Sequence, residues 1–95
     1  MKPPQYVTVI GKRFVVKEHE DLNGELGRCD CDKTTILFDA EQSLEALRDT
    51  VLHEVVHAVD HSMGTKMTEA QVRRMATGLL AVLRENAPFV KFLTA

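Results

Sequence analysis

A His-Glu-x-x-His motif gives this sequence its clearest chemical potential. His53 and His57 stand four residues apart, and Glu54 directly follows the first of them. On a helix, residues at i and i+4 share one face about 6 Å apart along the axis, so both imidazoles can converge on one zinc ion. Glu54 lies about 100° round the helix, where it can flank the metal and take a proton from a zinc-bound water. The pattern predicts two zinc ligands and a general base.

A third zinc ligand is needed, and several residues compete for the position. Glu69 comes twelve residues after His57, and a helical hairpin around Gly64 would return it toward the metal if the helices cross or the first ends early. In an unbroken helix His61 lies about 12 Å from His53 along the axis, which is too far for one zinc ion with bonds of about 2.0–2.1 Å. Glu69 is therefore the first choice for the third ligand, and the alternatives are Asp60, His61, His19 and water.

Two helices are predicted to carry these groups. Apolar residues at spacings of three and four predict a first helix that starts at a cap on Asp39 or Ser43 and ends near Ser62. Gly64 suits the position that terminates this helix. The expected core-facing stripe consists of Leu44, Leu47, Val51, Val55, Val59 and Met63.

The second helix begins at a capping box. Thr68 and Gln71 have the spacing of this motif, and Pro88 stops the helix around Asn86. The short apolar tail at residues 89–93 is expected to fold back on the core. The predicted apolar positions of this helix are Val72, Met75, Ala76, Leu79, Leu80 and Leu83.

Three strands complete the expected fold. Residues 5–17 predict a hairpin with a type II′ turn at Gly11-Lys12, which would pair Val9 with Phe14. Residues 19–33 are polar and predict a loop, whereas residues 34–38 predict a third strand, placed at the edge of the sheet beside the cleft. We expect an α+β domain in which a small, mostly antiparallel three-stranded sheet packs on the zinc-binding helix and a second long helix.

Composition limits the class of protein. The chain has 95 residues, 44% of them hydrophobic and 27% charged, with a net charge of -2. These values predict one globular domain over residues 1–95 and exclude disorder and a generic nucleic-acid-binding protein. No apolar run is long enough for a transmembrane helix, and residues 1–5 lack the apolar region of a secretory signal. Membrane and nucleic-acid partners are not expected.

The cysteine content points to a reducing compartment. Cys29 and Cys31 are the two cysteines, and two residues so close in sequence form no disulfide framework. A cytoplasmic location is therefore expected. A Cys-x-Cys pair is a weak metal signal because a structural zinc site takes four ligands, so both are interpreted as small side chains at a strand edge.

The segment from Gly27 to His57 resembles the ImmA/IrrE-type zinc metallopeptidases, which are common in phages and mobile elements. The resemblance lies in Gly27-Arg28-Cys29-Asp30, in the strand at residues 34–38 and in the run from Leu47 to His57. It implies a minimal gluzincin-like fold, with a small sheet over a zinc-binding helix and a following helix that carries a glutamate. It also implies His53 and His57 as zinc ligands and Glu54 as the catalytic base.

One feature of the second helix departs from this family. The family's usual glutamate ligand lies in a Glu-Ala-Asn segment, and the corresponding stretch here is Met75-Ala76-Thr77, which has no carboxylate. The resemblance therefore implies that the ligand has moved, most simply to Glu69, or that the site is incomplete.

The expected function is zinc-dependent hydrolysis of peptide bonds, with a peptide or protein, such as a regulatory protein, as substrate. An extended peptide could add to an edge strand beside the cleft through main-chain hydrogen bonds. The alternative function is a non-enzymatic, zinc-stabilised interaction module that acts on a regulator. A third possibility is a metal-free helical-hairpin adaptor.

Overall fold

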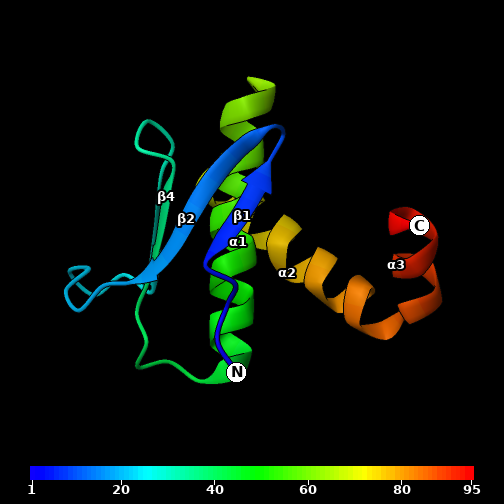
Figure 1. Cartoon of the computed structure of the whole chain (residues 1–95), viewed down its shortest axis with the longest axis horizontal. Coiled ribbons are helices and arrows are strands. Elements are labelled where there is room, and N and C mark those ends of the chain that lie inside the picture. The colour runs from blue at the N-terminus through cyan, green and yellow to red at the C-terminus, as the bar shows by residue number, and fades with distance from the viewer.

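Four strands and three helices make up the computed structural model, which describes residues 1–95 (Figure 1). The strands are β1 (Tyr6–Val9), β2 (Lys12–Glu18), β3 (Gly27–Asp30) and β4 (Thr35–Phe38). The helices are α1 (Leu44–Met63), α2 (Glu69–Glu85) and α3 (Ala87–Thr94). The predicted α+β class is confirmed. None of the helices combines the length and apolar character needed to cross a membrane.

The sheet is mixed, with the strand order β1-β2-β4-β3. The pairs β1–β2 and β3–β4 are antiparallel, whereas β2 and β4 run parallel. The prediction of three mostly antiparallel strands was therefore wrong. The missing strand is β3, inside residues 19–33, where a loop was predicted. Its sequence Gly-Arg-Cys-Asp has no β-branched residue, so only its pairing with β4 makes it a strand.

The order of the strands also changes which one lies at the edge. β4 is bonded on both sides, by β2 and by β3, so the prediction that residues 34–38 form an edge strand was wrong. The outer position next to α1 belongs to β3.

The first hairpin has a different register from the predicted one. Val7 pairs with Phe14 and Val9 with Lys12, so the turn residues are Ile10 and Gly11, both with positive φ (47° and 81°). Two central residues with positive φ are typical of a type I′ turn rather than type II′. The shift amounts to two residues on the partner strand, which leaves every side chain on its predicted face.

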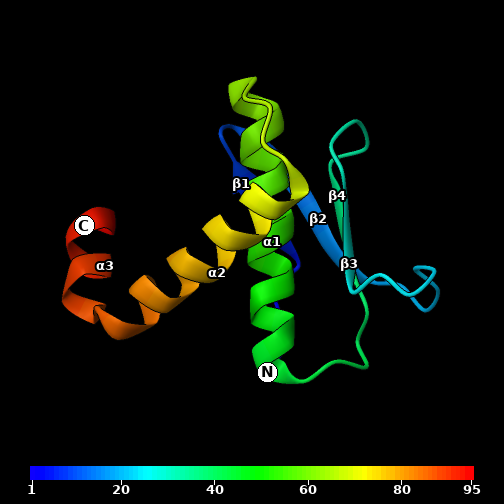
Figure 2. The ribbon, with the colours of Figure 1, turned by 180° about the vertical axis from the view of Figure 1, so that it is seen from behind.

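Helix α1 lies between two layers. The sheet covers one side of it in Figure 1, and α2 crosses the other side in Figure 2. The layer between α1 and the sheet contains the larger buried cluster, formed by Val9, Phe14, Val16, Ile36, Phe38 and Ala58. A smaller cluster between α1 and α2 contains Val56, Val72 and Ala76.

This sandwich changes the predicted core face of α1. Val59 and Met63 of the predicted stripe are exposed, because the end of α1 extends beyond the sheet (Figure 1). The helix instead buries Thr50 and Glu54, two polar residues, next to the sheet. A helix that is packed on two sides has no single apolar stripe. The spacing of three and four residues therefore predicted only some of the side chains that α1 buries.

The ends of the long helices follow sequence-encoded caps. The Ser43 hydroxyl accepts a hydrogen bond from the Ala46 amide, so Ser43 is the cap of α1 and Asp39 is not. Gly64 ends α1 with a left-handed φ of 70°, as predicted. The predicted capping box at the start of α2 is present, with reciprocal hydrogen bonds between Thr68 and Gln71.

The C-terminal tail forms a helix rather than folding back on the core. α3 starts directly after Asn86, with Pro88 in its first turn, and it contacts α2 but no other element. The prediction that residues 89–93 pack on the core was therefore wrong. Proline ends α2 as expected, but it also suits the first turn of a new helix.

Gly27 marks the closest approach of the sheet to α1. A Cβ atom at this position would lie 2.6 Å from the Thr50 methyl group and 3.0 Å from a carboxyl oxygen of Glu54. We expect Gly27→Ala to lower the free energy of unfolding by about 1–3 kcal/mol through this overlap. Urea denaturation of the purified variant measures the change.

A matched control is available at Gly78 in α2, where a Cβ atom would meet nothing within 4 Å. Gly78→Ala should raise the free energy of unfolding by about 0.5–1 kcal/mol, because alanine loses less conformational entropy in a helix. Equal effects of the two substitutions would contradict the close approach at Gly27.

Candidate metal centre

The side chains of His53 and His57 project from α1 toward the first residue of α2, Glu69. The Nε2 atom of His53 lies 2.6 Å from Oε1 of Glu69, and Nε2 of His57 lies 2.9 Å from Oε2. The two imidazole centroids are 4.9 Å apart, with an angle of 67° between the ring planes. One carboxylate therefore faces two imidazoles that stand one helical turn apart.

The connection between α1 and α2 holds Glu69 in this position. The Asp60 carboxylate accepts hydrogen bonds from the Thr65 hydroxyl (2.6 Å) and the Met67 amide (3.1 Å), which fixes the turn after Gly64. Those hydrogen bonds hold the pKa of Asp60 below its ordinary value, so this carboxylate stays ionised. The capping box then starts α2 directly before Glu69.

The angle at which the two helices cross determines the position of Glu69 along the axis of α1. α2 runs obliquely across α1 (Figure 2), with further contacts from the Thr77 hydroxyl to Asp49 at 2.9 Å and from Arg84 to Glu45 at 2.7 Å. A strictly antiparallel pair would have left Glu69 about a turn too high.

His53, His57 and Glu69 could hold a metal ion. One ligand atom from each of them lies within 4.8 Å of the others. Imidazole nitrogens with a carboxylate oxygen are ligands that suit zinc, and bonds of about 2.0–2.1 Å in a tetrahedron place ligand atoms about 3.3 Å apart. The observed separations of 2.6 and 2.9 Å between nitrogen and oxygen are hydrogen-bond distances. An ion would therefore require Glu69 to move back from the imidazoles and the two imidazoles, whose ligand atoms lie within 4.8 Å of each other, to turn toward a common centre.

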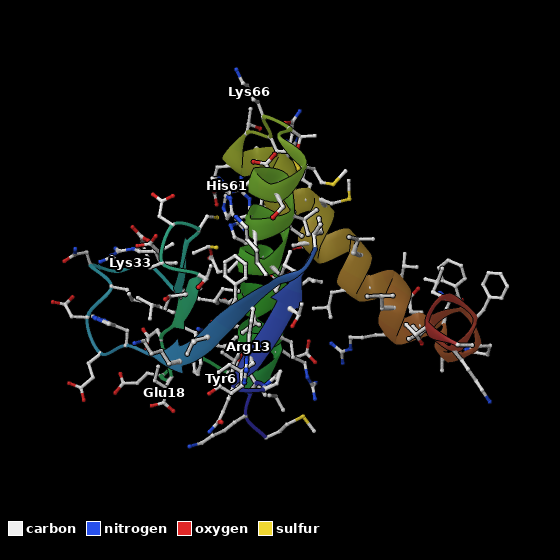
Figure 3. The ribbon with its side chains drawn as sticks, turned by 45° about the horizontal axis from the view of Figure 1, so that its top comes forward. Tyr6, Arg13, Glu18, Lys33, His61 and Lys66 are labelled. Carbon is white, nitrogen blue, oxygen red and sulfur yellow. The ribbon has the colours of Figure 1, made fainter.

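The other third-ligand candidates lie outside this group. Asp60 and His61 line the same pocket, but Asp60 is engaged in the turn and His61 is exposed near the end of α1 (Figure 3). His19 lies in the loop after β2, where its Nδ1 atom accepts a hydrogen bond from the Asp21 amide at 3.2 Å. Of the protein ligands considered from the sequence, only Glu69 joins the histidine pair.

Glu54 is almost completely buried beside the histidine pair, with 6% of its surface exposed. Burial, together with the negative charges of Glu69 and Glu25, raises the pKa of its carboxyl to about 7. A carboxyl group with this pKa gains and loses its proton near neutral pH. Such a group is suited to proton transfer.

Strand β3 forms the wall opposite α1. Its pairing with β4 places Arg28 opposite Leu37, and the Asp39 amide donates to the Leu26 carbonyl two residues earlier. In an antiparallel pair only every second residue bonds to the partner strand, and Leu26 is one of the bonded residues. The main-chain groups of Gly27 and Cys29 therefore point away from β4, toward the free edge of the sheet. The edge therefore offers unpaired N–H and C=O groups beside the metal centre.

The two cysteines line the same wall. Their sulfur atoms are 3.6 Å apart and both thiols are free. Burial, together with the hydrogen bond to Cys31, raises the pKa of the Cys29 thiol well above its ordinary value. Cys29 lies at the edge strand and packs partly against the core, as expected for a small strand-edge side chain.

Two contributions to the site were missed from the sequence. Gln42 donates to the Leu26 carbonyl at 3.1 Å and accepts from the Thr50 hydroxyl at 2.8 Å, so it ties the start of β3 to α1. Arg73 brings a positive charge to the pocket. It stands four residues after Glu69, and this helical spacing was the signal that placed both on one face.

The pocket at this centre has a volume of about 710 Å³, and most of the residues that line it are polar or charged. It is bounded by β3 with the preceding loop on one side and by α1 with the start of α2 on the other. An open cleft between a candidate metal-binding group and a free strand edge can admit an extended chain.

The comparisons with known proteins found nothing similar. No protein-family model matches the sequence, and no curated protein or solved structure matches the chain. The resemblance to the ImmA/IrrE-type peptidases thus stays a prediction from the motif and its surroundings.

The raised pKa of Glu54 makes the stability of metal-free protein depend on pH. The folded chain keeps this proton up to about pH 7, whereas an ordinary glutamate releases it near 4.5. Glu54 therefore contributes stability that is complete below pH 4.5 and is lost as the pH rises through 7. Glu54→Gln should match the parent at pH 4 and exceed its free energy of unfolding by about 2–3 kcal/mol at pH 8.

Urea denaturation in the presence of EDTA measures this difference. The exposed Glu41→Gln serves as the control and should change stability by less than about 0.5 kcal/mol at both pH values. An equal offset of Glu54→Gln from the parent at pH 4 and pH 8 would show that the burial of Glu54 does not shift its pKa.

Proposed function

We propose that the protein is a zinc-dependent metallopeptidase. The observation that carries this proposal is the convergence of three ligand groups, His53, His57 and Glu69, next to the buried carboxyl group of Glu54. Two imidazoles and a carboxylate form the protein ligand set of a catalytic zinc site that keeps one position open.

Each residue has a distinct role in the proposed reaction. The zinc ion would supply a Lewis acid that polarises the scissile carbonyl and lowers the pKa of bound water toward 7. Glu54 would accept the proton of the attacking water and pass it to the departing amine, a role open to a carboxyl group that lines the same pocket as the histidine pair. Glu69 would complete the ligand set with His53 and His57, and as the first residue of α2 it would join that helix to α1 through the ion.

The free edge of β3 supports a peptide as the substrate. An extended peptide can pair with the main-chain groups of Gly27 and Cys29, which lie beside Glu54. This edge replaces residues 34–38, for which the role was predicted from the sequence. The absence of a side chain on Gly27 leaves this stretch of the edge close to the catalytic carboxyl group.

The second candidate function is the zinc-stabilised interaction module, which the small size of the core favours. Only ten apolar residues are buried, nine of them in two separate clusters, so an ion that joins α1 to α2 would add substantially to stability. In this case Glu54 would have no chemical role.

Glu54→Gln separates the two functions. For a peptidase, this variant should bind zinc like the parent and cleave peptides about 10²–10⁴-fold more slowly, because only the general base is lost. Cleavage is measured by mass spectrometry on a peptide library derived from a whole proteome, with zinc content measured in parallel. The control is Glu41→Gln, which should cleave like the parent. Equal cleavage by the parent and Glu54→Gln would contradict the proposed role of Glu54.

Zinc affinity tests the ligand set. Glu69→Ala should weaken zinc binding by at least about tenfold, whereas His61→Ala, an exposed histidine in the same pocket, should leave it unchanged. Competition titration with a chromophoric chelator measures both affinities. A parent-like affinity of Glu69→Ala would remove Glu69 from the ligand set.

Removal of the metal should also destabilise the fold. Because the ion would bind only the folded chain, its binding free energy adds to stability. We expect EDTA to lower the Tm of the zinc-loaded protein by several degrees and to have no effect on His53→Ala, which has already lost a ligand. An unchanged Tm of the parent after chelation would contradict metal binding.

A further inference from the structure

The last helix, α3, has almost no cover within its own chain. Phe92, Leu93 and Phe89 are 78%, 56% and 46% exposed, and no residue of this helix is buried. α3 contacts α2 and nothing else, and it lies at the far end of an arm that leaves the body of the molecule (Figures 1 and 3). Isolated helices shorter than about 12–15 residues are marginal in water, so eight residues need a covering surface.

The outer part of α2 shares this exposure. Met75, Leu79 and Val82 are exposed apolar residues on the same arm as α3. The six exposed side chains of the arm present on the order of 500 Å² of apolar surface, since a large aromatic side chain alone covers about 150–250 Å². A stable interface buries about 800 Å² per partner, so this surface is a large part of one.

An apolar groove of about 360 Å³ lies elsewhere on the same chain. It opens between the N-terminal segment, the first half of α1 and the last half of α2, with a lining that includes Pro3, Leu44, Leu47, Val51, Leu80 and Leu83. The ion pair of Arg84 with Glu45, 2.7 Å long, spans the two helices beside it. α3 of the same chain has no contact with α1, so it does not fill this groove.

We propose that the occupant of this groove is α3 of a second copy of the chain, so that each of two copies places its α3 in the groove of the other. Each chain carries one uncovered apolar helix and one unfilled apolar groove, and a twofold arrangement covers both at once. A partner with a different sequence could cover the arm or fill the groove, but only a second copy of this chain supplies an apolar helix and an apolar groove together. In the reciprocal arrangement each chain buries its groove lining as well as its arm surface, which enlarges the interface.

The proposed interface leaves the metal centre open. No residue that lines the groove also lines the metal-site pocket. Dimerisation therefore stands apart from the proposed peptidase activity, and either can fail without the other.

Sedimentation equilibrium of the full chain, with reducing agent and EDTA present, tests the proposal. The parent should be a dimer. Phe92→Asp, which places a charge on the exposed face of α3, should weaken the dimer by at least about 30-fold, as expected for a central interface residue. Ile10→Asn is the control: Ile10 is 58% exposed in the first hairpin turn, and its positive φ suits asparagine. It should dimerise like the parent.

The groove is tested from the other side by Leu44→Asp. Leu44 is the exposed first residue of α1, where an aspartate is compatible with the helix N-terminus, so the variant should fold. It should weaken the dimer as strongly as Phe92→Asp. Leu83→Glu provides a second groove variant if Leu44→Asp fails to show the circular dichroism of the parent.

Mixing the two variants tests the reciprocal arrangement itself. A mixed dimer of Phe92→Asp with Leu44→Asp restores one intact contact, an unmodified α3 in an unmodified groove, so the mixture should dimerise more strongly than either variant alone. A monomeric parent, a dimer that resists Phe92→Asp, or a dimer that resists both groove variants would each overturn the proposal.

Discussion

The contact between Glu69 and the two histidines of α1 is the constraint on which the rest of the site depends. It places the first residue of α2 at 2.6 and 2.9 Å from imidazole nitrogens that are one turn apart on α1. Such a contact requires a defined end to α1, a fixed turn and a defined start to α2. Gly64, Asp60 and the Thr68 capping box provide these three features.

The same helix crossing explains why a carboxyl group is buried at the centre of the molecule. α1 packs against the sheet on one side and α2 on the other, so Glu54 is enclosed by the β3 wall and by the histidine pair. Burying a carboxylate is unfavourable, and the raised pKa of Glu54 is the measure of that cost. Groups with such shifted pKa values concentrate at functional sites. The stability that the protein loses by burying Glu54 is therefore consistent with the proposed role of this residue in proton transfer.

The small core gives both proposals a common physical basis. Twelve of 95 residues are buried, and nine of the ten buried apolar residues form two clusters on opposite sides of α1. A domain of this size gains little from its own core, so a metal ion between α1 and α2 and a second chain over α3 would each add stability that the core lacks. The two surfaces are separate, with the cleft on the β3 side and the apolar groove near the start of α1.

The sequence by itself determined the features that depend on local geometry. Helical spacing placed His53 and His57 on one face, and caps at Gly64 and Thr68 predicted where α1 ends and α2 begins. Non-local pairing decided the rest. β3 has no intrinsic strand preference, so only its bonding to β4 made it the edge strand, and the tail became a helix with no cover inside the chain. The angle at which α2 crosses α1 depends on packing across two layers, which local patterns do not encode, and this angle brought Glu69 to the histidines.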